Sequence, residues 1–414
     1  MKRKKLAIIF HESLTWISGG ERFMYEEAKF LEEYGLKVIF LTFAFDSNEL
    51  FFVLPGGYQP HIEVLNKKGP WAGIWHLRKR IKQLKPEIII THYPLNCRFL
   101  YPATLFTKFS YFLHIFSTMF WFTSQQDLTK YSFLYRKVFD KIRNSTPGHK
   151  EFIFPRAPQM NLIEKIRLEL LTLLVHLGVR KAKKIFVFSK QMKWEVKLLY
   201  GKEAIILKGA YPENILSYKQ NKDIKRELGI VNKKMILNIN TLQSRKRVDL
   251  LIKAFKIISK KLNNCVLVIG GKGPEEMSLK KLASELNISD KVEFVGRIDE
   301  EDLWDFYKNC DIFVHPNWAD FVLTIYEALA LGKRIVCSSE MEFDDCLKDY
   351  PSIFIAEPTI DDFARAIEEA LKTKVDGKID RKILARYSWE YYFKRVLEEL
   401  GVSRVKEIDY EYNF

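Results

Sequence analysis

Hydrophobic residues along this chain follow two alternating patterns. Short apolar runs of strand length occupy residues 6–10, 37–42, 86–92, 185–189, 235–240, 265–270, 292–296, 311–315, 334–336 and 353–355. Between many of these runs, apolar side chains recur every three or four residues, as on one face of a helix. Apolar strands that alternate with helices are typical of parallel sheets covered by helices. The pattern therefore predicts an α/β protein.

The length of the chain indicates more than one hydrophobic core. With 414 residues, the chain suits two domains of roughly 200 residues each. The strand and helix pattern restarts near residue 235 after a charged segment, so we place the first domain at residues 1–210 and the second at 211–386. An apolar content of 47% with 29% charged residues is that of an ordered globular protein.

The cysteines and the N-terminal residues predict a cytoplasmic location. The five cysteines are far apart and include no Cys-x-x-Cys pair, which argues against a disulfide framework or a structural zinc site. Residues 6–10 form only a short apolar run after a basic start. A secretory signal needs a longer apolar core, so this run reads as a first strand.

Positive charge is concentrated in one part of the chain. The formal net charge is +15, and residues 51–200 hold 25 Lys and Arg against 8 Asp and Glu. A localised basic surface can attract nucleic acid, an anionic membrane or an acidic substrate. The alternative is that the charge only keeps the protein soluble.

Residues 99–122 are the most aromatic part of the chain, and their apolar positions recur at helical spacing. The segment exceeds the ~20 residues that span a bilayer. Lys108 near its middle argues against spanning, because a central lysine costs roughly 2.5–3.5 kcal/mol on insertion scales. We therefore predict an amphipathic helix, which would lie either in the domain core or at a membrane interface.

Three cations follow the predicted strand 235–240 directly. Arg245, Lys246 and Arg247 precede a predicted helix that begins at Asp249. Cations at the carboxyl end of a buried strand are costly unless an anion lies there. A solvated turn is the alternative, but the position favours a diphosphate.

A second candidate site lies between residues 313 and 336. An apolar strand leads into a polar loop with Asp320, then into a helix that ends at Gly332. The first amides of this helix, around Phe321, Val322 and Leu323, would attract an anion. Glu327 lies one turn inside the helix, where a carboxylate is suited to accept hydrogen bonds from hydroxyls such as those of a ribose.

Glycine turns and one histidine mark further strand ends. Gly19 and Gly20 follow the first strand, and Gly271 and Gly273 follow strand 265–270. Glycines allow backbone to approach a phosphate or a sugar closely. His92 ends strand 86–92, where ligands bind in open parallel sheets, although it could equally be an ordinary loop histidine.

These motifs resemble the family 4 retaining glycosyltransferases. Glu327 falls on the second glutamate of the family's C-terminal signature, while Ala319 takes the place of the first and Asp320 follows it. The glycine usual after the aromatic is Val322 here. The Gly19–Gly20 turn is similar to the family's N-terminal glycine turn.

The resemblance implies roles for further residues. Lys246 matches the lysine that neutralises the leaving phosphates, and Arg245 or Arg247 would substitute for the companion arginine, which is Thr241 here. Arg297 follows Gly296 in a turn like the one that contacts the base. Ser124 or Gln125 aligns with the loop that faces the reacting sugar in the family.

The resemblance also implies the GT-B fold, in which two facing Rossmann-like domains enclose a cleft and a C-terminal helix, here within residues 387–414, returns to the first domain. The implied reaction moves a hexose, with mannose as the first choice, from a GDP-sugar or UDP-sugar with retention at the anomeric carbon. Lys246 would stabilise the leaving group and Asp320 would hold a sugar hydroxyl. His92 and Ser124 would lie on the acceptor side, and no metal or cofactor is expected.

The basic segment 51–200 and the aromatic helix suggest a glycan or lipid-linked acceptor at the cytoplasmic face of a membrane. Two other classes of protein stay open. Ala319, Thr241 and Val322 could mark a catalytically degenerate GT-B protein that serves as a binding or partner protein. Nucleic-acid binding ranks last, because the aromatic residues lie on an apolar face and do not interleave with the cations.

Overall fold

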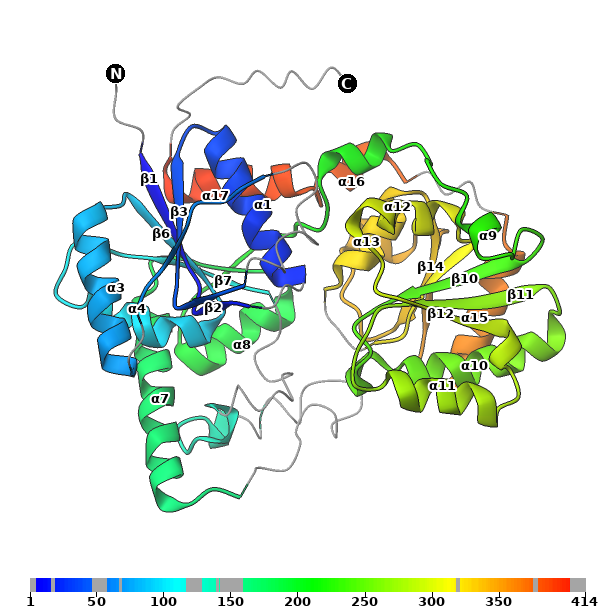
Figure 1. Ribbon diagram of the computed structural model, residues 1–414, viewed down its shortest axis with the longest axis horizontal. Coiled ribbons are helices and arrows are strands. Elements are labelled where there is room, and N and C mark those ends of the chain that lie inside the picture. The colour runs from blue at the N-terminus through cyan, green and yellow to red at the C-terminus, as the bar shows by residue number, and fades with distance from the viewer. Residues whose placement is uncertain are drawn as a thin grey trace. The chain divides into compact units, whose positions relative to one another are not determined.

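The structure is a computed structural model that describes residues 5–15, 19–46, 58–66, 69–116, 129–138, 141, 159–317, 321–374 and 379–402. The described residues form two compact α/β units (Figure 1). Among the described residues, the first unit contains those up to Lys208 and again from Trp389, and the second contains Gly209–Ser388. Each unit has its own parallel sheet.

The first unit is built on a seven-stranded parallel sheet in the order β5-β3-β1-β6-β7-β8-β9. Buried apolar runs form its central strands, as expected where helices cover both faces of a sheet. The strands are β1 (Leu6–Phe10), β3 (Lys37–Thr42), β5 (Ile62–Val64), β6 (Ile88–His92), β7 (Phe112–Ile115), β8 (Ile185–Val187) and β9 (Ile205–Ile206). The short strands β2 (Ser13–Leu14) and β4 (Ala44–Phe45) pair separately.

Helices cover this sheet in two groups. Helix α4 (Cys97–Thr104) packs against both α3 (Pro70–Leu84) and α7 (Leu162–Lys181), and α8 (Lys190–Tyr200) packs against α7 (Figure 1). Helix α1 (Gly19–Glu33) packs against α17 (Trp389–Leu400).

Helix α17 completes the first unit from the far end of the sequence. Its Phe393 ring lies 5.1 Å from that of Phe23 and 5.3 Å from that of Phe30, both on α1. The Tyr392 ring lies 4.9 Å from that of Phe23. All of these aromatic contacts join residues more than 350 positions apart, so part of the core of the first unit comes from the C-terminal helix.

The prediction of one amphipathic helix over residues 99–122 is wrong within the described part of that range. Helix α4 ends at Thr104, and residues 112–115 form strand β7 between β6 and β8. The chain turns at Phe106, which has a left-handed φ of 56°. Arg78 donates to the carbonyl of Leu105 at 2.7 Å and so stabilises this turn. A short apolar run does not distinguish a strand from a helix by spacing alone. Residues 117–122 lie outside the described residues.

The second unit has the strand order of a Rossmann fold. Its six parallel strands are ordered β12-β11-β10-β13-β14-β15, so the chain runs outward from β10 in one direction and then returns to continue in the other. The strands are β10 (Lys234–Ile239), β11 (Cys265–Gly270), β12 (Val292–Gly296), β13 (Ile312–His315), β14 (Arg334–Ser338) and β15 (Ile353–Ala356). The helices are α9 (Ile224–Glu227), α10 (Val248–Lys261), α11 (Glu276–Glu285), α12 (Glu300–Asn309), α13 (Leu323–Ala330), α14 (Asp345–Lys348), α15 (Ile360–Lys372) and α16 (Arg381–Ala385).

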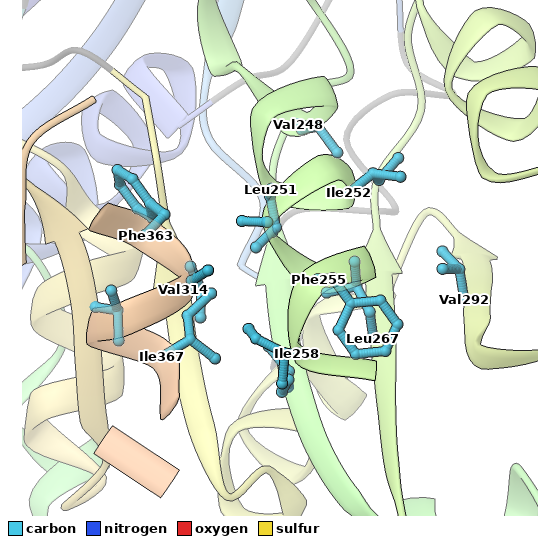
Figure 2. Close-up of a cluster of buried hydrophobic side chains, with 14 of the residues drawn as sticks. Val248, Leu251, Ile252, Phe255, Ile258, Leu267, Val292, Val314, Phe363 and Ile367 are labelled. Atoms are coloured by element: carbon cyan, nitrogen blue, oxygen red, sulfur yellow. The ribbon is translucent and has the colours of Figure 1, made fainter. Parts of the chain in front are cut away.

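Helix α10 is anchored on this sheet by one apolar face (Figure 2). Its buried residues recur at helical spacing and pack with side chains from β11, β12, β13 and α15. The cluster includes Val248, Leu251, Ile252, Phe255, Ile258, Leu267, Val292, Val314, Phe363 and Ile367. Because Val248 is the first residue of α10 and is itself buried, the loop that precedes the helix is fixed at the edge of the sheet.

In the parts of the chain that the structure describes, no helix is both long enough and apolar enough to cross a membrane.

Candidate functional site

The candidate site lies at one edge of the sheet of the second unit. Strands β10 and β13 are hydrogen-bonded neighbours and parallel, so the loops that follow them begin at the same edge. The chain reverses its direction of travel across the sheet between these two strands. Ligands of open parallel sheets bind beyond the carboxyl ends of the strands at such a switch point.

The loop after β10 carries the cations Arg245 and Lys246. Both lie in the short helical turn Ser244–Lys246, and both side chains are partly exposed. Among the described residues, no side chain accepts a hydrogen bond from Lys246. Burial and the neighbouring Arg245 lower the pKa of Lys246 well below its usual value. The charged form of Lys246 therefore needs an anion, which the described chain does not supply.

Arg247 has a different environment. Its guanidinium forms a bidentate ion pair with Glu340, with Nη1 2.5 Å from Oε2 and Nη2 3.3 Å from Oε1. Both side chains are buried, and Ser338 also donates to Glu340 Oε2, at 2.8 Å. The ion pair of Arg247 and Glu340 therefore connects the loop after β10 to the loop after β14. Of the two arginines beside Lys246, Arg245 is the one that is partly exposed.

The glycine turn after β11 packs directly on this basic loop. The amide of Asn240 donates to the carbonyl of Gly270 at 3.0 Å, and the amide of Leu242 donates to the carbonyl of Lys272 at 3.0 Å. A Cβ at Gly271 would lie 1.7 Å from the Asn240 carbonyl oxygen, and one at Gly273 would lie 2.2 Å from that of Leu242. The absence of side chains at Gly271 and Gly273 therefore allows these two loops to pack closely, independently of any contact with a ligand.

We expect Gly271→Ala to shift the basic loop. Gly271 has φ +122° and no space for a Cβ, so its replacement should cost clearly more than the about 1–2 kcal/mol of a left-handed alanine. Gly229→Ala is the matched control, since Gly229 has φ +66° and nothing within 4 Å of an added Cβ. Urea denaturation of both variants tests the difference. Equal losses of stability would contradict the close packing of the two loops.

The end of β13 and the loop after it contribute two polar residues that the sequence did not mark. His315, the last residue of β13, and Asn317 are both buried. Within the described part of the chain their side-chain nitrogen and oxygen atoms make no well-formed hydrogen bond, although Asn317 is close enough to His315 to influence its pKa. Burial, and then the charge of nearby Lys246, lower the pKa of His315. Buried polar atoms without partners are costly. A ligand at this edge of the sheet could supply the missing hydrogen bonds.

Helix α13 begins at the same loop. Phe321 and Val322 are buried, and Val322 caps the helix without a side-chain hydrogen bond, as expected for a residue with an apolar side chain. Leu323 is the first helical residue. Glu327 is buried one turn inside, and Tyr307 of α12 donates to its Oε2 at 3.0 Å. Tyr307 therefore fixes the carboxylate of Glu327, a contact that the sequence did not indicate.

The other predicted site residues are more scattered. Arg297 is exposed just after β12. Asp320 and Ser124 lie outside the described residues. Gly19 and Gly20 begin α1 in the first unit, where a Cβ at Gly20 would lie 2.0 Å from the hydroxyl of Tyr93. The tyrosine hydroxyl thus accounts for a glycine at position 20.

His92 lies inside the first unit. It is the last residue of β6, has no exposed surface, and its Nε2 lies 2.9 Å from Glu27 Oε2. In this arrangement a bound acceptor could contact His92 only after its surroundings opened.

Solved structures with the same architecture identify the fold. Over 96% of this chain and 99% of its own, the Anabaena protein HepE, solved in complex with UDP and glucose, is similar with a TM-score of 0.70 and 14% sequence identity. Two Rossmann-like parallel α/β units in one chain define the GT-B fold, as the sequence predicted.

Family models then identify the family. The model of glycosyl transferases group 1 matches residues 220–388, and that of glycosyltransferase family 4 matches residues 17–147, which together make up more than half of the chain. The chain belongs to the group 1, family 4 glycosyltransferases.

Individual relatives match more locally. An uncharacterized glycosyltransferase of Methanocaldococcus jannaschii is 25% identical over 243 residues, which are 55% of this chain and 62% of the relative. The alpha-monoglucosyldiacylglycerol synthase of Streptococcus pneumoniae is 29% identical over 154 residues, which are 36% of this chain and 34% of the relative. The chain thus spans between about a third and two thirds of the length of these relatives.

Proposed function

We propose that the protein is a retaining glycosyltransferase that moves a hexose from a nucleotide diphosphate sugar to a glycan or lipid-linked acceptor. The observation that carries this proposal is the position of Lys246. It lies at the switch point of a Rossmann-type sheet, beside a second cation and without a counter-ion among the described residues. Family membership supports the same conclusion.

The chemistry of the transfer fits these residues. The bond between the anomeric carbon and the phosphate oxygen breaks, and the diphosphate leaves with that electron pair. The acceptor oxygen bonds to the anomeric carbon, and its proton passes to the leaving diphosphate. Stabilisation of growing negative charge is usually the largest catalytic contribution. Lys246 and Arg245 would supply it, assisted by the first amides of α13. Asp320 remains the predicted partner of a sugar hydroxyl.

The identity of the donor sugar nucleotide is the first point to test. Family resemblance puts GDP-mannose first, and the UDP and glucose in the HepE structure are a reason to include UDP-glucose. The purified protein would be incubated with GDP-mannose, UDP-glucose and UDP-N-acetylglucosamine, with and without a lipid extract, and free GDP or UDP would be measured. We expect nucleotide release from one donor, increased by the extract. Saturable donor binding without release would favour a catalytically degenerate partner protein.

Glu327 should contribute to donor affinity. Loss of a hydrogen bond to a charged group costs about 1.5–3 kcal/mol, so Glu327→Gln should weaken donor binding by roughly tenfold to a hundredfold. Tyr307→Phe is the matched control, because it removes the hydroxyl that donates a hydrogen bond to Glu327 and leaves the carboxylate in place. Calorimetric titration of both variants measures the effect. Unchanged affinity in Glu327→Gln would limit Glu327 to a structural role.

We also propose that the first unit docks on an anionic membrane through helix α3. Trp71 is 76% exposed and Trp75 is 56% exposed, one helical turn apart, and Lys79 and Lys82 continue the same face. The Lys79 ammonium lies 5.2 Å from the centre of the Trp75 ring. Tryptophan side chains favour the headgroup level of a membrane, and nearby lysines attract anionic lipids.

Other features of the same unit support this surface. Helix α4 packs against both α3 and α7, and α7 exposes a stripe of apolar side chains: Leu162, Ile163, Ile166, Leu170 and Leu173. The excess positive charge of residues 51–200 complements an anionic bilayer. The name of the Streptococcus pneumoniae relative includes a diacylglycerol, which is a membrane lipid.

A Trp71→Ala, Trp75→Ala double variant should bind vesicles of anionic phospholipid roughly tenfold or more weakly at low salt, because two exposed indoles no longer enter the interface. Met277→Ala is the control, since Met277 is 77% exposed but lies in the second unit. Sedimentation with vesicles measures the binding. If both variants sedimented equally with the vesicles, α3 would not be the helix that docks on the membrane.

A further inference from the structure

Three side chains with metal-binding atoms meet inside the first unit. Glu27 comes from α1, His92 from the end of β6 and His114 from β7, which pairs with β6. All three are at most 1% exposed. One ligand atom from each lies within 4.8 Å of the others. The cluster is therefore formed by three elements that are distant in sequence and adjacent in the fold.

The hydrogen bonds of this cluster are incomplete. Glu27 Oε2 lies 2.9 Å from His92 Nε2, whereas Glu27 Oε1 lies 3.4 Å from His114 Nε2. Glu27 Oε1 and His114 Nε2 are buried and make no hydrogen bond within the described part of the chain, although they lie at ion-pair distance from each other. Buried polar atoms are nearly always paired with protein, with water or with an ion. An ion shared by these two atoms would satisfy both.

The remaining contact of His114 suits a metal ligand. Its Nδ1 lies 2.7 Å from the hydroxyl of Tyr392 on α17. In metal sites the second ring nitrogen of a histidine is commonly held by an oxygen, which fixes the orientation of the ring. In the tautomer in which Nδ1–H donates to Tyr392, Nε2 carries a lone pair on the side of Glu27. The same contact connects the cluster to the C-terminal helix.

Two imidazoles and one carboxylate are a donor set of divalent transition metals. Zinc binds histidine nitrogens at about 2.0–2.1 Å in tetrahedral geometry, which places neighbouring donor atoms roughly 3.3–3.4 Å apart. His92 Nε2 lies 2.9 Å from one oxygen of Glu27 and His114 Nε2 lies 3.4 Å from the other, and one ligand atom from each residue lies within 4.8 Å of the others. The three side chains would therefore have to close on a bound zinc ion.

We propose that Glu27, His92 and His114 bind a divalent transition-metal ion with the chemistry of Zn²⁺, with a water molecule as fourth ligand. The site belongs to the first unit, whereas the cations at the sheet edge belong to the second. Because the ligands have no more than 1% exposed surface, the ion holds α1, β6 and β7 together and takes no part in the transfer of the sugar. The alternative occupant is a shared proton, in which case the cluster holds no metal.

Metal analysis of the purified protein distinguishes a bound metal ion from a shared proton. The full chain would be produced without a polyhistidine tag in zinc-supplemented medium, passed through a desalting column and analysed by mass spectrometry for metals. We expect about one equivalent of zinc that remains bound through the desalting column. Glu27→Gln should lose the zinc, whereas His176→Asn should retain it, since His176 lies on α7 outside the cluster. Wild-type protein with no zinc above the buffer background would overturn the proposal.

Cobalt substitution tests the location even if a variant fails to fold. Protein produced with Co²⁺ should show ligand-field absorption bands of nitrogen and oxygen coordination, without the charge-transfer band of a thiolate. A thiolate band would place the metal on a cysteine such as the exposed Cys346 and would overturn the proposal. Absence of any visible band would do the same.

Discussion

Replacing Lys246 by alanine should lower kcat/KM for sugar transfer by roughly 10²- to 10³-fold, the loss typical when one group that stabilises a developing anion is removed. The structural reason is that Lys246 has no partner among the described side chains and lies next to Arg245, which also lowers its pKa. A diphosphate would favour the charged form of the lysine. Steady-state rates of nucleotide release measure the effect.

Lys253→Ala is the control for this variant. Lys253 lies on α10, the helix that follows the basic loop, but it is exposed and pairs with Asp249 one turn earlier, at 3.0 Å. Loss of this side chain should change kcat/KM by less than about twofold, because an exposed pair contributes at most about 0.3–0.5 kcal/mol. If Lys246→Ala retained activity like that of Lys253→Ala, the assignment of the leaving-group site would be wrong.

Breaking the buried pair of Arg247 and Glu340 should have the largest effect on stability. Arg247→Ala leaves the carboxylate of Glu340 buried and uncompensated, which costs about 3–5 kcal/mol. The double variant Arg247→Met, Glu340→Leu should recover most of that loss, because packed apolar side chains can replace a buried ion pair. The midpoint of urea denaturation measures both.

The exposed pair of Lys280 and Glu276 on α11 provides the comparison. Lys280→Ala should cost no more than about 0.5 kcal/mol, since its ion pair is largely solvated. If Arg247→Ala were as mild as Lys280→Ala and instead weakened donor binding strongly, Arg247 would belong to the donor site.

Much of the fold could be predicted because buried parallel strands appear as continuous apolar runs. Strands β1 and β3 have the bounds that the sequence predicted, residues 6–10 and 37–42. The sequence assigns residues 112–115 to a helix because apolar residues recur at helical spacing over 99–122, and a short stretch such as Phe-Leu-His-Ile fits either element. Its partners, β6 and β8, lie far along the chain, and only they determine that it is a strand.

The candidate site was predicted less completely. The position of Lys246 after β10 could be predicted from local order along the chain. The partner of Arg247 could not, because Glu340 is 93 positions away and nothing near it in sequence marks an ion pair. His315 and Asn317 are visible in the sequence, but their lack of hydrogen-bond partners appears only when the surrounding loops are in place. The predicted cleft between the two domains stays a prediction.

The return of α17 to the first unit determines how the protein can be divided. A fragment that ends at residue 208 would lack Tyr392 and Phe393, and would leave Phe23 and Phe30 of α1 without part of their covering. Residues 209–388, in contrast, contain a complete six-stranded sheet in one continuous stretch. The second unit can therefore be produced from one continuous segment of the gene, whereas the first unit needs segments from both ends.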